Sequence, residues 1–142
     1  MTTVRQLLDG KSPDVHAVAP GAAVIDAIRL MAEQGIGAVL VMEGPRLVGI
    51  VSERDYARKI VLHERSSRDT PVADIMTAQV VTVAPSEQVP HCLQLVTDFR
   101  IRHLPVVEGG EVLGVISIGD LVKSVIDDQQ QKLDHLQQYI AG

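Results

Sequence analysis

The sequence of 142 residues carries a formal net charge of −5, and 46% of its residues are hydrophobic whereas only 2% are aromatic. A chain this long and this apolar can bury a core, which excludes a largely disordered protein. The acidic charge and the scarcity of aromatic rings argue against nucleic-acid binding, and no apolar run approaches the roughly 18 residues that a membrane span needs.

The first half of the chain predicts a short strand, an amphipathic helix, two further strands and a second helix. Val24, Ile28 and Met31 share one face of the first helix at helical spacing. Gly44 and Pro45 separate the two later strands as a turn. The expected elements are 15–18, 22–34, 38–42, 46–52 and 53–63.

A polar linker at 64–71 separates the two halves. Its last residue, Pro71, suits the start of a short helix that runs to Met76. The segment 3–8 is the expected counterpart of this helix ahead of the first half.

The second half predicts the same order of elements. Gly109 and Gly110 lie between its two later strands and indicate a hairpin. Its first helix places Cys92 on an apolar face with Val89 and Val96, so we interpret the one cysteine of the chain as a buried core thiol rather than a nucleophile. The expected elements are 80–83, 87–100, 104–107, 111–117 and a helix from 119 onward.

The end of the last helix carries a stripe of apolar residues among polar ones. Its members are Ile126, Leu133, Leu136 and Ile140. Two interpretations stay open, because the stripe suits either packing on its own domain or contact with a second chain or another partner.

The two halves are copies of one unit. The pattern Gly-x-x-Ser-x-x-Asp occurs at 49–55 and again at 114–120, and the offset of 65 residues that relates Gly49 to Gly114 also relates Pro20 to Pro85. Duplication of a β-α-β-β-α unit predicts an α/β (α+β) fold with small mixed sheets covered by helices.

The Ser-x-x-Asp pairs, Ser52 with Asp55 and Ser117 with Asp120, have two interpretations. As capping boxes they only begin a helix. A ligand is favoured by the preceding Gly, which often marks close approach of another group. It is also favoured by the helix start, which suits a phosphate, and by the carboxylate, which suits a ribose diol.

These motifs resemble those of cystathionine β-synthase (CBS) domains, and the pair resembles the module called a Bateman domain. The resemblance covers about 3–125 and rests on GIVSERD, GVISIGD, RHLPVV and DIMT, at 49–55, 114–120, 102–107 and 74–77. The run 52–59 is further similar to small stand-alone CBS-pair proteins of bacteria and plant organelles. We place one module over 1–142, with pseudo-twofold repeats at 10–63 and 75–126 and a C-terminal helix at 127–142.

The resemblance implies two clefts between the copies that bind an adenosine compound. AMP is the expected ligand, with ATP or NAD(H) as alternatives. Asp55 or Asp120 is expected to hold the ribose diol, and Ser52 or Ser117 to bond ribose or phosphate. Further expected contacts come from a hydroxyl ahead of a helix and from three basic side chains. These are Thr82, Arg54, Arg102 and His103.

The copies differ at several of these positions, which predicts two inequivalent clefts. Arginine suits phosphate recognition, and the alternative for Arg102 and His103 is a solvated strand edge. The differing pairs are Arg102 and Gly37, His103 and Ala38, Thr82 and Ala17, and Gly119 and Arg54.

No catalytic constellation is evident, because the histidines are scattered and the sequence has neither a Cys-x-x-Cys pair nor a Gly-rich phosphate loop. We therefore expect a non-catalytic regulatory module without a catalytic cofactor or metal. It is expected to be a cytoplasmic homodimer, without nucleic-acid or membrane contact, that acts on an unidentified partner protein through a ligand-driven shift. The alternative is a structural or interaction protein with degenerate clefts.

Overall fold

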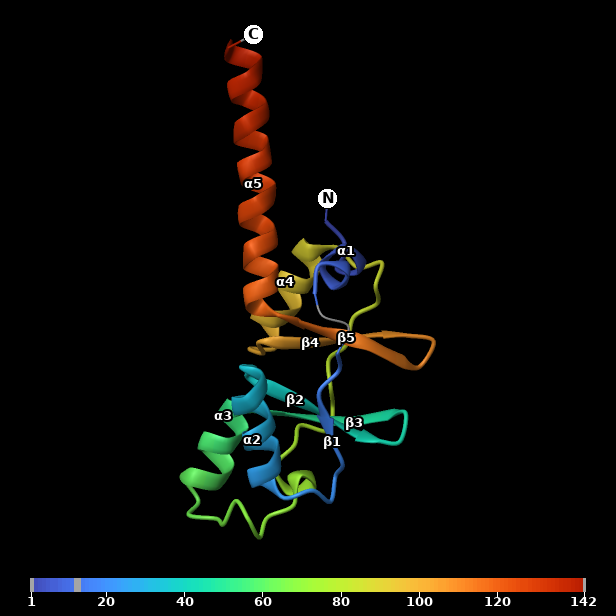
Figure 1. Ribbon diagram of the computed structural model, residues 1–142, viewed down its shortest axis with the longest axis vertical. Coiled ribbons are helices and arrows are strands. Elements are labelled where there is room, and N and C mark those ends of the chain that lie inside the picture. The colour runs from blue at the N-terminus through green and yellow to red at the C-terminus, as the bar shows by residue number, and fades with distance from the viewer. Residues whose placement is uncertain (1, 12–13, 142) are drawn as a thin grey trace. The chain divides into compact units, whose positions relative to one another are not determined.

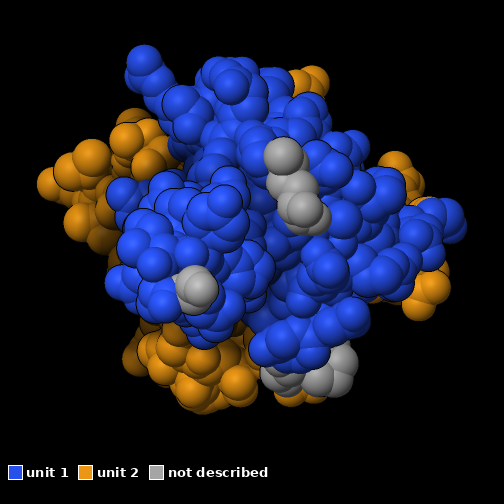
Figure 2. Space-filling view, turned by 90° about the horizontal axis from the view of Figure 1, so that it is seen from above, with its two compact units in different colours: residues 1–13, 82–109, 113–142 blue, residues 14–81, 110–112 orange. Residues whose placement is uncertain are grey.

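Residues 2–11 and 14–141 are described by a computed structural model (Figure 1). The chain forms two compact units, which Figure 2 distinguishes by colour. Unit 1 contains residues 1–13, 82–109 and 113–142, and unit 2 contains residues 14–81 and 110–112. The chain therefore passes from unit 1 to unit 2 and back to unit 1, and residues 110–112 at the second hairpin belong to unit 2 again.

Unit 2 is built on a three-stranded mixed sheet with the order β1-β2-β3. The short β1 pairs in parallel with β2, and β2 pairs antiparallel with β3 across the predicted turn at Gly44 and Pro45. The bounds are Ala17–Val18 for β1, Ala38–Glu43 for β2 and Arg46–Ser52 for β3.

Helices cover this sheet. The first, α2 (Val24–Gln34), contacts β1 and β2 through its predicted apolar face and ends at Gly35, whose φ of 63° is left-handed. The second, α3 (Glu53–Tyr56), continues into a π-helical turn, η1 (Ala57–Val61). The core is aliphatic because the chain has few aromatic residues. It contains Val24, Ala27, Met31, Val39, Val41, Val51, Ile60, Val72 and Ile75.

Unit 1 holds the corresponding elements of the second half. Its strands β4 and β5 form a two-stranded sheet, as the Gly109-Gly110 turn predicts. Helix α4 contacts both β4 and α5. The bounds are Val4–Asp9 for α1, Val89–Asp98 for α4, His103–Glu108 for β4, Glu111–Ser117 for β5 and Ile118–Ala141 for α5. Cys92 is buried in α4, as predicted, and burial followed by the charge of Glu87 raises the pKa of its thiol.

The strand expected at 80–83 is reduced to a single parallel bridge between Val83 and Val106. In unit 2, the N–H of Leu40 donates to the oxygen of His16, the residue directly before β1, at 3.1 Å. Pro105 stands where Leu40 stands in the first copy, and proline has no N–H to donate. The prediction of a full strand was therefore wrong for a local chemical reason.

The segments ahead of the two repeats are exchanged. Residues 2–5, which include the start of α1, bond the second repeat, whereas residues 70–73, which include the start of the short 3₁₀-helix η2 (Val72–Asp74), bond the first repeat. The paired bonds are Val4 N to Glu87 O at 2.8 Å and Val72 N to Ala22 O at 2.8 Å, then Val89 N to Thr2 O at 3.0 Å and Val24 N to Thr70 O at 2.9 Å. This confirms that 3–8 is the counterpart of the segment after Pro71.

Candidate functional site

Ser52 and Asp55 form a complete capping box at the start of α3. The Asp55 N–H donates to Ser52 Oγ at 3.2 Å, and Ser52 N–H donates to Asp55 Oδ2 at 3.0 Å. The Ser52 hydroxyl also donates to Asp55 Oδ2 at 3.1 Å. The strand β3 therefore ends and the helix begins with both side chains half-buried and fixed in place.

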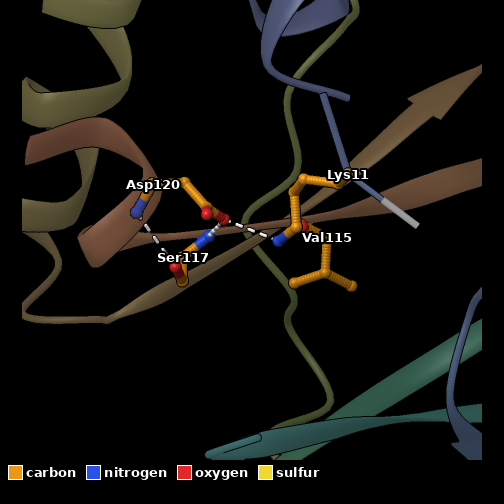
Figure 3. Close-up of polar contacts among 4 residues, drawn as sticks. All are labelled: Lys11, Val115, Ser117 and Asp120. Atoms are coloured by element: carbon orange, nitrogen blue, oxygen red, sulfur yellow. Dashed lines mark hydrogen bonds and ion pairs between the residues drawn. The ribbon is translucent and has the colours of Figure 1, made fainter. Parts of the chain in front are cut away.

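Ser117 and Asp120 repeat this arrangement where β5 passes into α5 (Figure 3). The Ser117 N–H donates to Asp120 Oδ2 at 2.8 Å, and the Asp120 N–H donates to Ser117 Oγ at 3.1 Å. The capping interpretation of both motifs is therefore confirmed, and each cap also holds a carboxylate at a helix N-terminus.

A lysine accompanies each of the two carboxylates. Lys59 Nζ lies 3.3 Å from Asp55 Oδ1 and donates to the oxygen of Ile75 at 2.8 Å. Lys11 Nζ lies 2.6 Å from Asp120 Oδ2 and donates to the oxygen of Val115 at 2.9 Å, as Figure 3 shows.

Neither lysine is among the site residues predicted from the sequence. Lys59 follows Asp55 by four residues in the same helical segment, a spacing at which side chains meet. The ion pair between these two residues could therefore have been predicted from the sequence. Lys11 stands 109 residues from Asp120, and no local pattern relates them. The residue of α5 that corresponds to Lys59 is Ser124, which is buried. The first copy thus obtains its lysine from its own helix, and the second obtains its lysine from the N-terminal segment.

Burial by itself would raise the pKa of Asp120. The hydrogen bonds from Lys11 and from the Ser117 backbone, together with the positive charge of Lys11, outweigh that effect and hold the pKa of the carboxyl below its usual value. Asp120 is therefore an anion at neutral pH, next to an ammonium group.

The two motif glycines make room for neighbouring side chains of the protein, and the expectation that a ligand approaches them is wrong. A Cβ on Gly49 would lie 2.5 Å from Met76 Sδ and 3.1 Å from the oxygen of Thr77. A Cβ on Gly114 would lie 2.8 Å from Leu8 Cδ2. The group that approaches each glycine is therefore a side chain of the exchanged segment, so the glycines are not evidence for a bound molecule.

The remaining predicted site residues fall in both units. Arg54 is exposed next to the first cap in unit 2, whereas Thr82, Arg102 and His103 belong to unit 1. The oxygen of Arg102 accepts the N–H of Ile118 at 2.8 Å, which brings the start of β4 to the second cap. Thr82 and Arg102 are exposed, and His103 is half-buried as the first residue of β4.

Each cap can bind a polar ligand by two kinds of contact, because an ionised carboxylate accepts hydroxyl groups and a neighbouring ammonium attracts anionic oxygens. Within residues 2–11 and 14–141, no cluster of three or more His, Cys, Asp or Glu side chains is arranged to hold a metal ion. In the same residues, no helix combines the length and the apolar character that crossing a bilayer requires.

Comparison with known proteins finds the CBS domain family model twice, over residues 4–62 and 72–127. The mitochondrial CBS domain-containing protein CBSX3 of Arabidopsis thaliana is 43% identical over 124 residues, which cover 84% of this chain and 60% of that protein. The chain therefore spans less than two thirds of this relative.

Two solved structures are similar to this chain. A protein with CBS domains from Burkholderia ambifaria is 56% identical, with a TM-score of 0.87, and the match covers 90% of this chain and 96% of the other. A CBS domain protein from Pyrobaculum aerophilum, complexed with AMP, is 28% identical, with a TM-score of 0.75, and the match covers 84% of this chain and 89% of the other.

Proposed function

We propose a function from one premise: the chain belongs to the CBS domain family and carries two CBS domains in tandem. We infer that this regulatory module binds an adenine nucleotide at its Ser-x-x-Asp caps and performs no catalysis. AMP is the proposed ligand, with ATP or NAD(H) as alternatives. The observation that carries the proposal is the pair formed by Asp120 and Lys11, which joins a carboxylate to an ammonium at a helix start.

The carboxylate suits a ribose. A ribose offers two adjacent hydroxyl donors, and an ionised carboxylate has about four lone-pair sites. Asp120 is ionised at neutral pH, and the cap bond from Ser117 fixes its orientation before any ligand arrives. Asp55 is fixed in the same way by Ser52.

The basic groups suit a phosphate. In unit 1 these are Lys11, Arg102 and His103, and in unit 2 they are Arg54 and Lys59. The two sets differ in number and in origin, which supports two unequal binding sites. The AMP-bound relative from Pyrobaculum aerophilum supports an adenosine compound as the ligand class.

A regulatory output follows from the position of Lys11. A ribose that bonds Asp120 competes with this lysine, and Lys11 lies directly after α1 in the N-terminal segment. A ligand that weakens the ion pair therefore also weakens the attachment of the N-terminal segment. Such a ligand binds the states with the ion pair formed and broken with different affinity, which is what a population shift requires. We propose that a separate partner protein reads this change, and that the module is a cytoplasmic homodimer.

One observation favours a second candidate, a structural or interaction protein that binds no nucleotide. Both caps are complete without any ligand, since each serine and each aspartate already bonds the other's backbone. The two candidate functions differ in whether the charge of the carboxylate contributes to nucleotide affinity when the cap itself is preserved.

The substitution Asp120→Asn separates them, because asparagine keeps an oxygen for the Ser117 N–H but loses the charge. We expect affinity for AMP, measured by calorimetry, to fall about ten- to hundredfold, as the loss of a hydrogen bond to a charged group predicts. Asp55→Asn tests the other cap. Asp127→Asn, on an exposed turn of α5, is the matched control and should bind as the unchanged protein does.

Thermal unfolding against AMP, ADP, ATP, NAD⁺, NADH, S-adenosylmethionine and GTP tests the ligand class. A nucleotide present at a hundredfold excess over its Kd stabilises the fold by about 2.7 kcal/mol. Stabilisation by adenosine compounds and not by GTP supports the proposal. If none of them shifts the transition, the structural candidate replaces it.

A further inference from the structure

Helix α5 carries an apolar seam that the rest of unit 1 leaves uncovered. The steps between its members alternate between four and three residues, which is the heptad spacing of a coiled coil. The seam consists of Val122, Ile126, Gln129, Leu133, Leu136 and Ile140. The exposed fractions of its five apolar members lie between 47% and 81%.

The seam is a different face of α5 from the one that packs on unit 1. Leu121 and Ser124 are buried, and Val125 and Asp128 are half-buried, so these four residues define the packed face. At about 100° per residue, the centre of the seam lies roughly 100° around the helix from this packed face. The seam is therefore not a continuation of the contact with α4.

Beyond Asp128, every described residue of α5 is exposed. Figure 1 shows this part of α5 extending away from the other elements of unit 1. Its thirteen residues, 129–141, span about 20 Å, a length at which a helix without packing is only marginally stable in water. A row of large apolar side chains at heptad spacing, with Gln129 as its one polar member, marks a contact of this helix with another molecule.

We propose that this contact is made with α5 of a second copy of the chain, and that the two helices run parallel and in register along the seam. The inference does not depend on nucleotide binding, because no seam residue belongs to either cap.

Gln129 favours a second copy of the chain as the partner of α5, and it favours a parallel orientation of the two helices. In a parallel pair, each heptad position meets itself, so Gln129 meets Gln129 of the second copy and the two amides can bond each other. In an antiparallel pair centred on the seam, Gln129 meets Leu133 of the other chain and its amide is buried against hydrocarbon. A single polar layer of this kind sets the register of a coiled coil at some cost in stability.

The flanking charges agree with this choice. In the parallel arrangement, Lys132 lies beside Gln137 of the second copy, so no like charges meet. In the antiparallel arrangement, Lys132 lies across from Lys132 of the other chain, which is repulsive. The aspartates of this region, at 127, 128 and 134, fall outside the flanking positions.

Disulfide trapping tests both the partner and the direction. In the full chain, Leu136→Cys should give a same-position covalent dimer under a mildly oxidising thiol buffer. Gln138→Cys, on the face opposite the seam, should not. The unchanged protein is a further control because its one cysteine, Cys92, is buried. Equal trapping at 136 and 138 would overturn the proposal.

A mixed experiment distinguishes the two directions. When Leu136→Cys chains are mixed with Ile126→Cys chains, a parallel pair gives same-position disulfides only. A predominant 126–136 disulfide, which an antiparallel pair would give, would also overturn the proposal.

Sedimentation equilibrium provides a measurement without cysteine chemistry. The double substitution of Leu133→Asp with Leu136→Asp should raise the dissociation constant of self-association about tenfold or more, because it places charges in the paired seam. The control, Gln131→Asp with Gln138→Asp, adds the same charge on the opposite face and should leave that constant unchanged. Equal constants for the two variants would contradict the proposal.

Discussion

Lys11 Nζ lies 2.6 Å from Asp120 Oδ2, although 109 residues separate the two in the sequence. The carboxylate is half-buried and receives the Ser117 N–H as well, so the lysine compensates for the burial of an anion. This one ion pair also joins the N-terminal segment to the helix start that the second motif creates.

Removal of the ammonium should raise the pKa of Asp120. In Lys11→Met, burial remains while the lysine's hydrogen bond and charge are lost, so the midpoint of the Asp120 carboxyl titration, followed by NMR, should move upward. In the unchanged protein the pKa is lowered on folding. The resulting stability is thus present above the usual pKa of an aspartate and is lost as the pH falls through the lowered value.

The control for this prediction is Lys132→Met, which removes an exposed lysine more than three turns further along α5 and should leave the Asp120 midpoint in place. An unchanged midpoint in Lys11→Met would mean that the ion pair does not persist in solution. Because both side chains are partly exposed, the expected loss of unfolding free energy at neutral pH is only about 0.5–1 kcal/mol.

The two motif glycines should differ in their tolerance of a methyl group. In Gly49→Ala the new Cβ meets Met76 Sδ and the backbone oxygen of Thr77, whereas in Gly114→Ala it meets only the end of the Leu8 side chain. We expect Gly49→Ala to lower the free energy of unfolding by about 1–3 kcal/mol, because the backbone there must shift. Gly114→Ala should cost less.

Urea unfolding measures both losses, and a double-mutant cycle with Met76→Ala tests the cause. If the clash with Met76 is responsible, the penalty of Gly49→Ala should shrink when the methionine is shortened. An equal penalty with and without Met76→Ala would contradict this explanation.

Arg100 has a left-handed backbone, with φ of 53°, after α4, where the first copy has Gly35 with φ of 63° after α2. A side chain in this conformation costs about 1 kcal/mol relative to glycine. Arg100→Gly should therefore be more stable than Arg100→Ala by about that amount in thermal or urea unfolding, because both variants lose the arginine side chain and only alanine retains the strain. Equal stability of the two variants would show that the backbone relaxes at this position.

The sequence predicts most of the repeated architecture because its signals are local. The Gly109-Gly110 step predicts the second hairpin, and the apolar spacing of Val24 and Met31 predicts the buried face of α2. Both caps follow from Ser and Asp three residues apart. These features depend on residues that are neighbours in the chain, so one copy of the repeat is enough to reveal them.

The features that could not be predicted from the sequence arise from contacts between residues distant in the chain, or from the loss of a single hydrogen-bond donor. Lys11 reaches Asp120 only because the segments ahead of the repeats are exchanged, which no spacing indicates. The glycine at 49 is explained by Met76, which the motif itself does not include. Pro105 removes one N–H and thereby shortens a strand that the apolar run 80–83 predicts. The roles of Thr82, Arg54, Arg102 and His103 toward a phosphate stay predictions.

Because the segments are exchanged, the second repeat is completed by residues that are synthesised well before it. Thr2 and Val4 leave the ribosome before Val89 and Glu87, the residues that they bond. At a translation rate of roughly 5–20 residues per second, several seconds separate the synthesis of the N-terminal segment from that of the residues that it bonds, and unit 2 is made in this interval.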